Sequence, residues 1–108
     1  MSGFDERQKG FEKKFEKDQE FQFKATARRN RLLGMWAADL MGIKGEAADA
    51  YAKDVVKADF ELPGDEDVVG KVMGDLKARG ITQSEHQLRK KMDELFAVAK
   101  EQLMKEVR

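Results

Sequence analysis

Residues 25–45, "ATARRNRLLGMWAADLMGIKG", contain the clearest structural signal in the chain. Large apolar side chains recur there at spacings of three and four residues, which is the repeat of one helix face. They are Leu32, Met35, Trp36, Leu40 and Met41. The helix is predicted to end at Gly42 in the left-handed conformation, with Ile43 folded back onto the last turn. The stretch therefore predicts one amphipathic helix with a defined end.

A second helix is predicted in "GEAADAYAKDVVKADF", residues 45–60. Small and branched apolar side chains there form two adjacent rows at i,i+4 spacing, and charged residues flank them. The sequence "ELPGDED" follows, in which Pro63 and Gly64 predict a turn. Asp65 is the predicted N-cap of the next helix.

Two further helices complete the predicted fold. The third carries five valine, methionine and leucine positions and ends at "RGI", as the first ends at "MGI". Ser84 and Gln87 in "SEHQ" form a capping-box pattern that opens the last helix. No alternating run of β-branched residues, typical of a strand, occurs in the sequence.

The predicted fold class is all-α, a four-helix bundle of residues 21–108 preceded by a mobile, partly helical N-terminal arm of residues 1–20. Short connections between the helices favour antiparallel neighbours. The residues expected in the core are Trp36, Tyr51, Leu76, Met92 and Phe96.

The N-terminal arm combines large aromatic side chains with a polar sequence. On a helix, Phe4, Phe11 and Phe15 fall within an arc of roughly 40°. Gly3 and Gly10 weaken that helix, and an isolated helix of this length is marginal in water. We expect the arm to be frayed when free and helical when docked on another protein, with the three phenylalanines as anchors. The alternative is that the phenylalanines pack back onto the bundle, although the downstream apolar faces already suffice for its core.

Composition excludes several classes of protein. Charged residues make up 39% of the 108 residues, yet the net charge is zero, so no overall field attracts nucleic acid or an anionic membrane. The chain has no cysteine and no apolar run approaching the ~18 residues of a membrane-spanning helix. We therefore expect a cytoplasmic protein with neither nucleic-acid binding nor direct membrane insertion. The arm as a membrane-surface helix is a weaker alternative, because it carries nearly as many acids as bases.

No motif in the sequence predicts catalysis, a cofactor or a metal. His86 is the single histidine and has neither a catalytic partner nor metal-ligand spacing. "GDEDVVGKV" differs from a phosphate-binding loop in its glycine spacing, and Val72 stands where that loop needs a hydroxyl. The acidic "DED" lacks the spacing of a calcium loop. The sequence predicts a protein that is not an enzyme.

A basic patch precedes the main apolar repeat. It consists of Lys24, Arg28, Arg29 and Arg31, with no acidic residue between Phe21 and Ala38. Such a patch can bind phosphate, and it leaves open the alternative function of a sensor of nucleotide or another anion, including weak nucleotide binding, through Arg28, Arg29 and Arg31. The acid-rich stretch of residues 46–67 offers an internal partner, and internal pairing is the preferred interpretation.

Specific motifs resemble a known family. "ARRN", "LLG" and "WAA" within residues 27–38, followed by "GDEDV" and preceded by "FEKKFEKDQEFQF", are similar to the zeta inhibitor subunit of the alphaproteobacterial F1Fo-ATP synthase. The resemblance spans nearly the whole chain. It implies a non-enzymatic regulator of the F1 motor, built as a four-helix bundle with a mobile N-terminal inhibitory segment.

The same resemblance implies how such a regulator acts. The inhibitory segment, residues 1–17 here, enters the catalytic interface between the alpha and beta subunits, becomes helical and touches gamma. Hydrolysis is then blocked, and the bound protein lies at the cytoplasmic face of the inner membrane. The partner-binding residues implied are Phe4, Asp5, Glu6, Arg7, Phe11, Lys13, Lys14 and Phe15.

Overall fold

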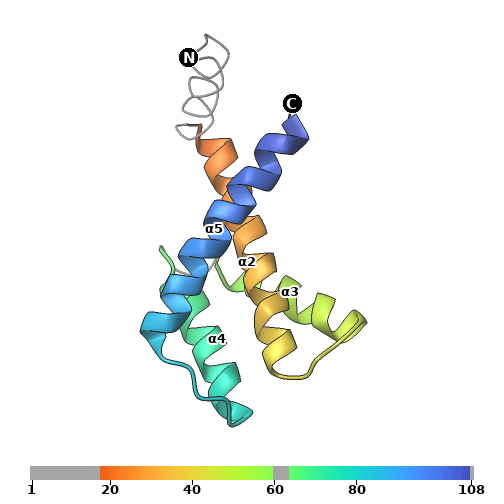
Figure 1. The fold of residues 1–108 in the computed structure, drawn as a ribbon, viewed down its shortest axis with the longest axis vertical. Helices are drawn as coiled ribbons and strands as arrows, with labels where there is room; N and C mark the ends of the chain where they lie inside the picture. The colour runs from red at the N-terminus through yellow and green to blue at the C-terminus, as the bar shows by residue number, and fades with distance from the viewer. Residues whose placement is uncertain (1–17, 60–63, 108) are drawn as a thin grey trace, which may run out of the picture.

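The computed structural model describes residues 18–59 and 64–107. These residues form four α-helices and no strand, as Figure 1 shows. The helices are α2 (Gln19–Leu40), α3 (Glu46–Ala58), α4 (Glu66–Ala78) and α5 (Glu85–Val107). The all-α prediction with four helices is confirmed, while residues 1–17 of the predicted arm lie outside the described part of the chain.

The two predicted glycine stops are confirmed. Gly42 and Gly80 have φ values of 74° and 73°, in the left-handed region that glycine adopts without steric cost. The Ile43 amide donates to the Ala38 carbonyl at 2.8 Å, and the Ile81 amide donates to the Leu76 carbonyl at 2.9 Å. These six-to-one bonds close the last turns of α2 and α4.

The helix N-termini confirm one capping prediction and correct another. The Ser84 amide donates to the Gln87 side-chain oxygen at 3.2 Å, and the Gln87 amide donates to the Ser84 hydroxyl at 3.0 Å, so the predicted capping box is present. Asp65 occupies the N-cap position of α4, but its side chain makes no capping bond. Its carboxylate is instead drawn to Arg29 of α2, because a charged partner competes well with neutral backbone donors.

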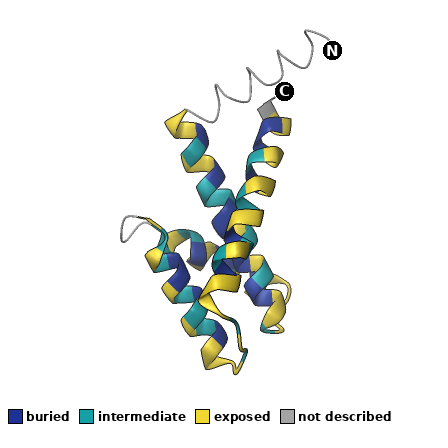
Figure 2. Ribbon diagram, turned by 60° about the vertical axis from the view of Figure 1, so that its left-hand side comes forward, coloured by how far each residue is buried: buried dark blue, intermediate teal, exposed yellow. Residues whose placement is uncertain are grey.

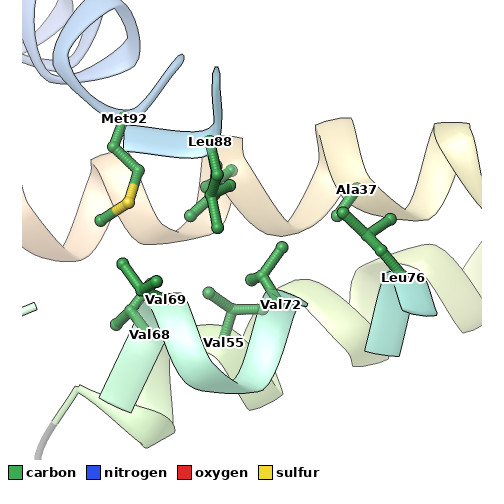
Figure 3. Close-up of a cluster of buried hydrophobic side chains, with 9 residues drawn as sticks. Ala37, Val55, Val68, Val69, Val72, Leu76, Leu88 and Met92 are labelled. Atoms are coloured by element: carbon green, nitrogen blue, oxygen red, sulfur yellow. The ribbon is translucent and has the colours of Figure 1, made fainter. Parts of the chain in front are cut away.

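The main core lies where all four helices meet. In Figure 1, α3 and α4 flank the lower halves of the long helices α2 and α5. The core packs branched aliphatic side chains from the four helices, several of which Figure 3 shows facing one another. Its buried members are Leu33, Ala37, Val55, Val68, Val69, Val72, Leu76, Leu88 and Met92.

A second, smaller cluster lies at the other end of the long helices. Phe21 and Ala25 of α2 pack there with Leu103 and Met104 of α5, and Phe96 covers the cluster. Figure 2 shows the start of α2 and the end of α5 extending beyond α3 and α4. The end of the molecule at which α2 begins is therefore a two-helix extension of the bundle.

The predicted core is partly confirmed. Leu76 and Met92 are buried, whereas Trp36, Tyr51 and Phe96 are only half-buried and pack against the edges of the two clusters. A cation lies over each of the three rings, and the Lys91 ammonium, for example, lies 5.8 Å from the centroid of the Trp36 ring. Trp and Tyr rings are seldom buried completely, and Phe96 packs only against the small cluster of α2 and α5, so the prediction overstated the burial of all three.

The buried face of α2 is only partly the predicted one. Trp36 and Met41 pack against the main core, but Met35 and Leu40 are exposed. Small residues of α2, among them Gly34, are buried as well, and Gly34 faces α3. Gly34 is the closest point: a Cβ placed there would lie 2.6 Å from the Ala52 Cα. The small side chains let the two helix backbones approach, which a count of large apolar residues does not reveal.

Candidate functional site

The residues predicted to bind a partner protein lie outside the described part of the chain. They are Phe4, Asp5, Glu6, Arg7, Phe11, Lys13, Lys14 and Phe15. The described structure begins immediately after this segment. Asp18 is the N-cap of α2, and its carboxylate accepts from the backbone amides of Glu20 at 2.8 Å and Phe21 at 3.3 Å. The point at which the arm joins α2 is thus a well-capped helix start.

An open groove begins beside this helix start. It has a volume of about 770 Å³ and lies between residues of α2, α3 and α5. Its apolar lining comes from Phe21, Phe23, Ala27, Val56 and Leu103. The charged side chains around it are more often basic than acidic, and they come from all three helices.

The structure divides the predicted basic patch between two places. Lys24, Arg28 and Arg31 line the groove, and Arg29 does not. The Lys24 ammonium pairs with Glu20 at 3.2 Å, one helical turn away. The Arg28 guanidinium pairs with the Glu106 carboxylate of α5 at 2.6 Å. Arg31 is exposed and has no ion pair within residues 18–59 and 64–107.

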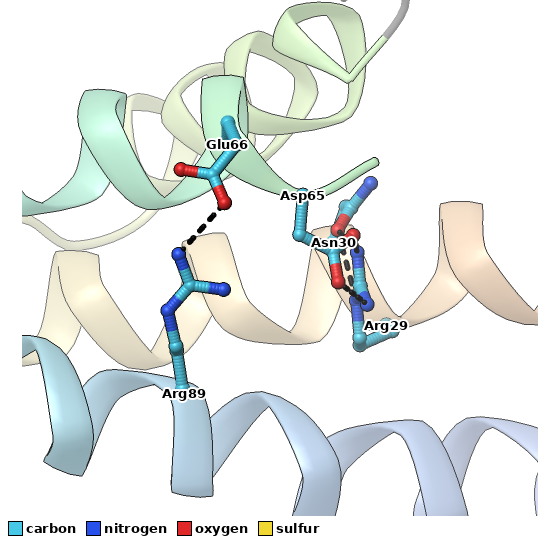
Figure 4. Close-up of polar contacts among 5 residues, drawn as sticks. All are labelled: Arg29, Asn30, Asp65, Glu66 and Arg89. Carbon is cyan, nitrogen blue, oxygen red and sulfur yellow. Dashed lines mark hydrogen bonds and ion pairs between the residues drawn. The ribbon is translucent and has the colours of Figure 1, made fainter. Parts of the chain in front are cut away.

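Arg29 is a buried structural residue. Its guanidinium donates to both carboxylate oxygens of Asp65, at 2.8 and 3.2 Å. It also donates to the Asn30 side-chain oxygen at 2.8 and 3.1 Å, as Figure 4 shows. Because Asp65 belongs to the acid-rich stretch of residues 46–67, the predicted internal pairing is confirmed for this arginine. The pair ties the start of α4 to the middle of α2.

A carboxyl group beside this pair has an altered acidity. Burial raises the pKa of the Asp59 carboxyl above its ordinary value. The Arg29 guanidinium and the Asn30 amide oppose this shift, and the carboxylates of Asp65 and Asp67 add to it. The Asn30 amide nitrogen makes no hydrogen bond of standard geometry within the described residues.

Replacing Arg29 with methionine is expected to lower the free energy of unfolding by about 1–2 kcal/mol, because the buried Asn30 oxygen loses its donors. This loss of stability is smaller than that expected on breaking a fully buried ion pair, because the Asp65 carboxylate is partly exposed and can be hydrated once Arg29 is gone. Arg28→Met is the matched control, and it should change stability by about 1 kcal/mol or less because its ion pair is exposed. Urea unfolding of both variants measures the difference, and equal losses would contradict the structural role of Arg29.

The described residues contain no group of three or more histidine, cysteine or acidic side chains arranged to hold a metal ion. None of their helices has the length and apolar character needed to span a membrane. His86 lies in the first turn of α5 and is exposed.

Comparison with known proteins identifies the family. Residues 1–102 match the family model described as ATPase inhibitor subunit zeta. The chain belongs to the ATPase inhibitor subunit zeta family. The match includes residues 1–17, so the arm is part of what the family shares. Membership indicates a regulator of ATP synthase that acts on its F1 part as an inhibitor.

One solved structure has a similar fold. It was determined in solution by NMR and is 54% identical in sequence. The alignment covers 79% of this chain and 96% of that chain, with a TM-score of 0.70. No curated protein matches this chain significantly.

Sequence reasoning missed the contribution of α3 to the groove. Lys53, Val56 and Lys57 line it, although the sequence pattern suggested only that the lysines flank an apolar face. Their i,i+4 spacing was a visible signal that both lysines share one side of the helix. What the spacing could not show is that this side faces Arg31 of α2 in the zeta fold.

Proposed function

We propose that this chain inhibits ATP hydrolysis by inserting its N-terminal arm between the alpha and beta subunits of F1, against gamma. The observation that carries the proposal is the family match, which extends over residues 1–17 as well as the helices. The bound chain would lie at the cytoplasmic face of the inner membrane. The chain itself needs to catalyse no reaction, because an arm inserted at a catalytic interface blocks the conformational changes that the motor needs for hydrolysis.

Binding of the arm must offset the entropy of ordering it. Fixing the backbone of each residue costs about 1–2 kcal/mol. Charged residues of the arm contribute little unless they are desolvated, so the phenylalanines are the side chains able to supply the largest gain. Phe4, Phe11 and Phe15 share one face of a helical arm, and that face is the proposed contact with F1.

The alternative function, an anion sensor that uses Arg28, Arg29 and Arg31 together, has weaker support. Arg29 is buried and engaged with Asp65, in a place separate from the groove that Arg28 and Arg31 line. An incoming phosphate would have to break that ion pair to contact all three guanidinium groups.

The double substitution Phe4→Ala and Phe11→Ala tests the proposal. We expect the concentration for half-maximal inhibition of purified F1 to rise about tenfold or more, because two apolar anchors are lost. The measurement is ATP hydrolysis at increasing inhibitor concentration. Lys9→Ala with Lys17→Ala is the matched control, since both lysines lie outside the phenylalanine arc, and it should change that concentration much less. Unchanged inhibition by the phenylalanine variant would rule out these residues as anchors.

A further inference from the structure

The groove between α2, α3 and α5 has unbalanced charge. Five basic residues line it: Lys24, Arg28, Arg31, Lys53 and Lys57. Three acidic residues also line it, and each is already engaged. Glu20 pairs with a lysine, Glu106 pairs with an arginine, and Asp18 caps α2.

Three cations of the groove have no counter-ion among residues 18–59 and 64–107. Arg31, Lys53 and Lys57 are exposed, and none of them has an ion pair in the part of the chain that the structure describes. They lie beside the apolar side chains of Ala27 and Val56. A ligand that fits this surface therefore carries negative charge on one side and apolar side chains on the other.

The charge of the groove argues against two occupants from the chain itself. The arm contains five basic residues and four acidic ones within residues 1–17, so folding it back would add positive charge to a positive surface. The groove of a second copy carries the same three unpaired cations, so two grooves would repel each other. A complementary occupant has to come from a different protein.

We infer that the groove binds an acidic amphipathic helix of the motor that the arm inhibits. This inference rests on the proposed function, because the groove begins at the helix start from which the arm extends. A bundle held by an inserted arm presents this groove to the F1 surface next to the catalytic interface. Apart from the N-cap Asp18, the lining comes from three helices, so a helix lying in a groove is the mode of recognition that fits.

Charge reversal at the three unpaired cations tests the inference in the full-length chain. Arg31→Glu, Lys53→Glu and Lys57→Glu together should raise the concentration for half-maximal inhibition of F1 about tenfold, mainly by slowing association. Inhibition at saturation should remain complete, because the arm is intact. Added salt should weaken inhibition by the parent chain more than inhibition by the variant, since the contacts that the variant lacks are electrostatic.

The matched control reverses Lys44, Lys77 and Lys90, which are exposed and do not line the groove. Lys77 lies in the last turn of α4, as Lys57 lies in the last turn of α3, so the effects on helix dipoles are similar. Circular dichroism of both variants checks the fold. If the two variants lose potency equally, the groove inference fails and the proposed function stands. If the parent chain does not inhibit F1, both fail.

Crosslinking identifies the occupant directly. The chain has no cysteine, so Val56→Cys can be labelled uniquely with a photoactivatable maleimide before F1 is added. We expect a crosslink to an acidic helical segment of an F1 subunit. A crosslink to residues 1–17 of the same chain, or no protein crosslink, would overturn the inference. ADP binding by the free full-length chain, with spectral changes confined to the groove, would assign the groove to nucleotide instead.

Discussion

A chain shortened to begin at Lys17 is expected to lose all inhibition of ATP hydrolysis by F1 and to keep the fold of the full-length protein. Both cores of the described structure are built from residues after this point, the first of them being Phe21. The shortened chain retains Asp18, so α2 keeps its N-terminal cap. Loss of that cap would by itself cost about 1 kcal/mol and would confuse the comparison.

The readouts are F1 hydrolysis across a range of inhibitor concentrations and thermal unfolding followed by circular dichroism. Loss of inhibition with an unchanged unfolding curve would assign the effect to the arm and leave the helices as its carrier. Equal inhibition by the two chains would contradict the proposed function, because activity would then belong to the bundle.

Gly34→Ala is expected to lower the free energy of unfolding by about 2–3 kcal/mol, although alanine is the better helix former. The added Cβ would lie 2.6 Å from the Ala52 Cα, which is a backbone atom and cannot move without shifting α3. It would also lie 3.3 Å from a Val55 methyl group in the main core. The separation of the two helices therefore decides the sign of the effect.

The same substitution in α4 provides the control. A Cβ at Gly70 or Gly74 would meet nothing within 4 Å. Gly70→Ala and Gly74→Ala should each stabilise the protein by about 0.5–1 kcal/mol, because alanine has the higher helix propensity. Urea unfolding of the three variants measures all of these changes. If Gly34→Ala were also stabilising, α2 and α3 would have to lie farther apart than the structure shows.

Local features of the fold were predictable because their causes are local. The Gly42 and Gly80 stops, and the Ser84–Gln87 capping box, each involve contacts within about one helical turn. The number and order of the helices followed from apolar spacing and turn residues in the same way. The family was also accessible from short motifs, and the match over residues 1–102 confirmed it.

Contacts between helices were harder to predict. Arg29 and Arg31 are close neighbours in the sequence and both looked like members of one patch. Their positions differ by 200° around a helix, so one reaches Asp65 across the core edge while the other lines the groove. Sequence composition suggested an internal partner for the patch, but it could not assign one carboxylate to one arginine.

The sequence by itself determined that residues 18–59 and 64–107 form four helices with defined ends, and that three phenylalanines at helical spacing precede them. Backbone hydrogen bonding and helix periodicity act over a few residues, so the chain order already contains that information. Only the tertiary structure decided that α2 approaches α3 at Gly34 while Met35 and Leu40 stay exposed, and that Arg31 meets Lys53 and Lys57 around one groove. Those outcomes depend on how closely helix surfaces fit, which is a property of pairs of helices and not of any one segment.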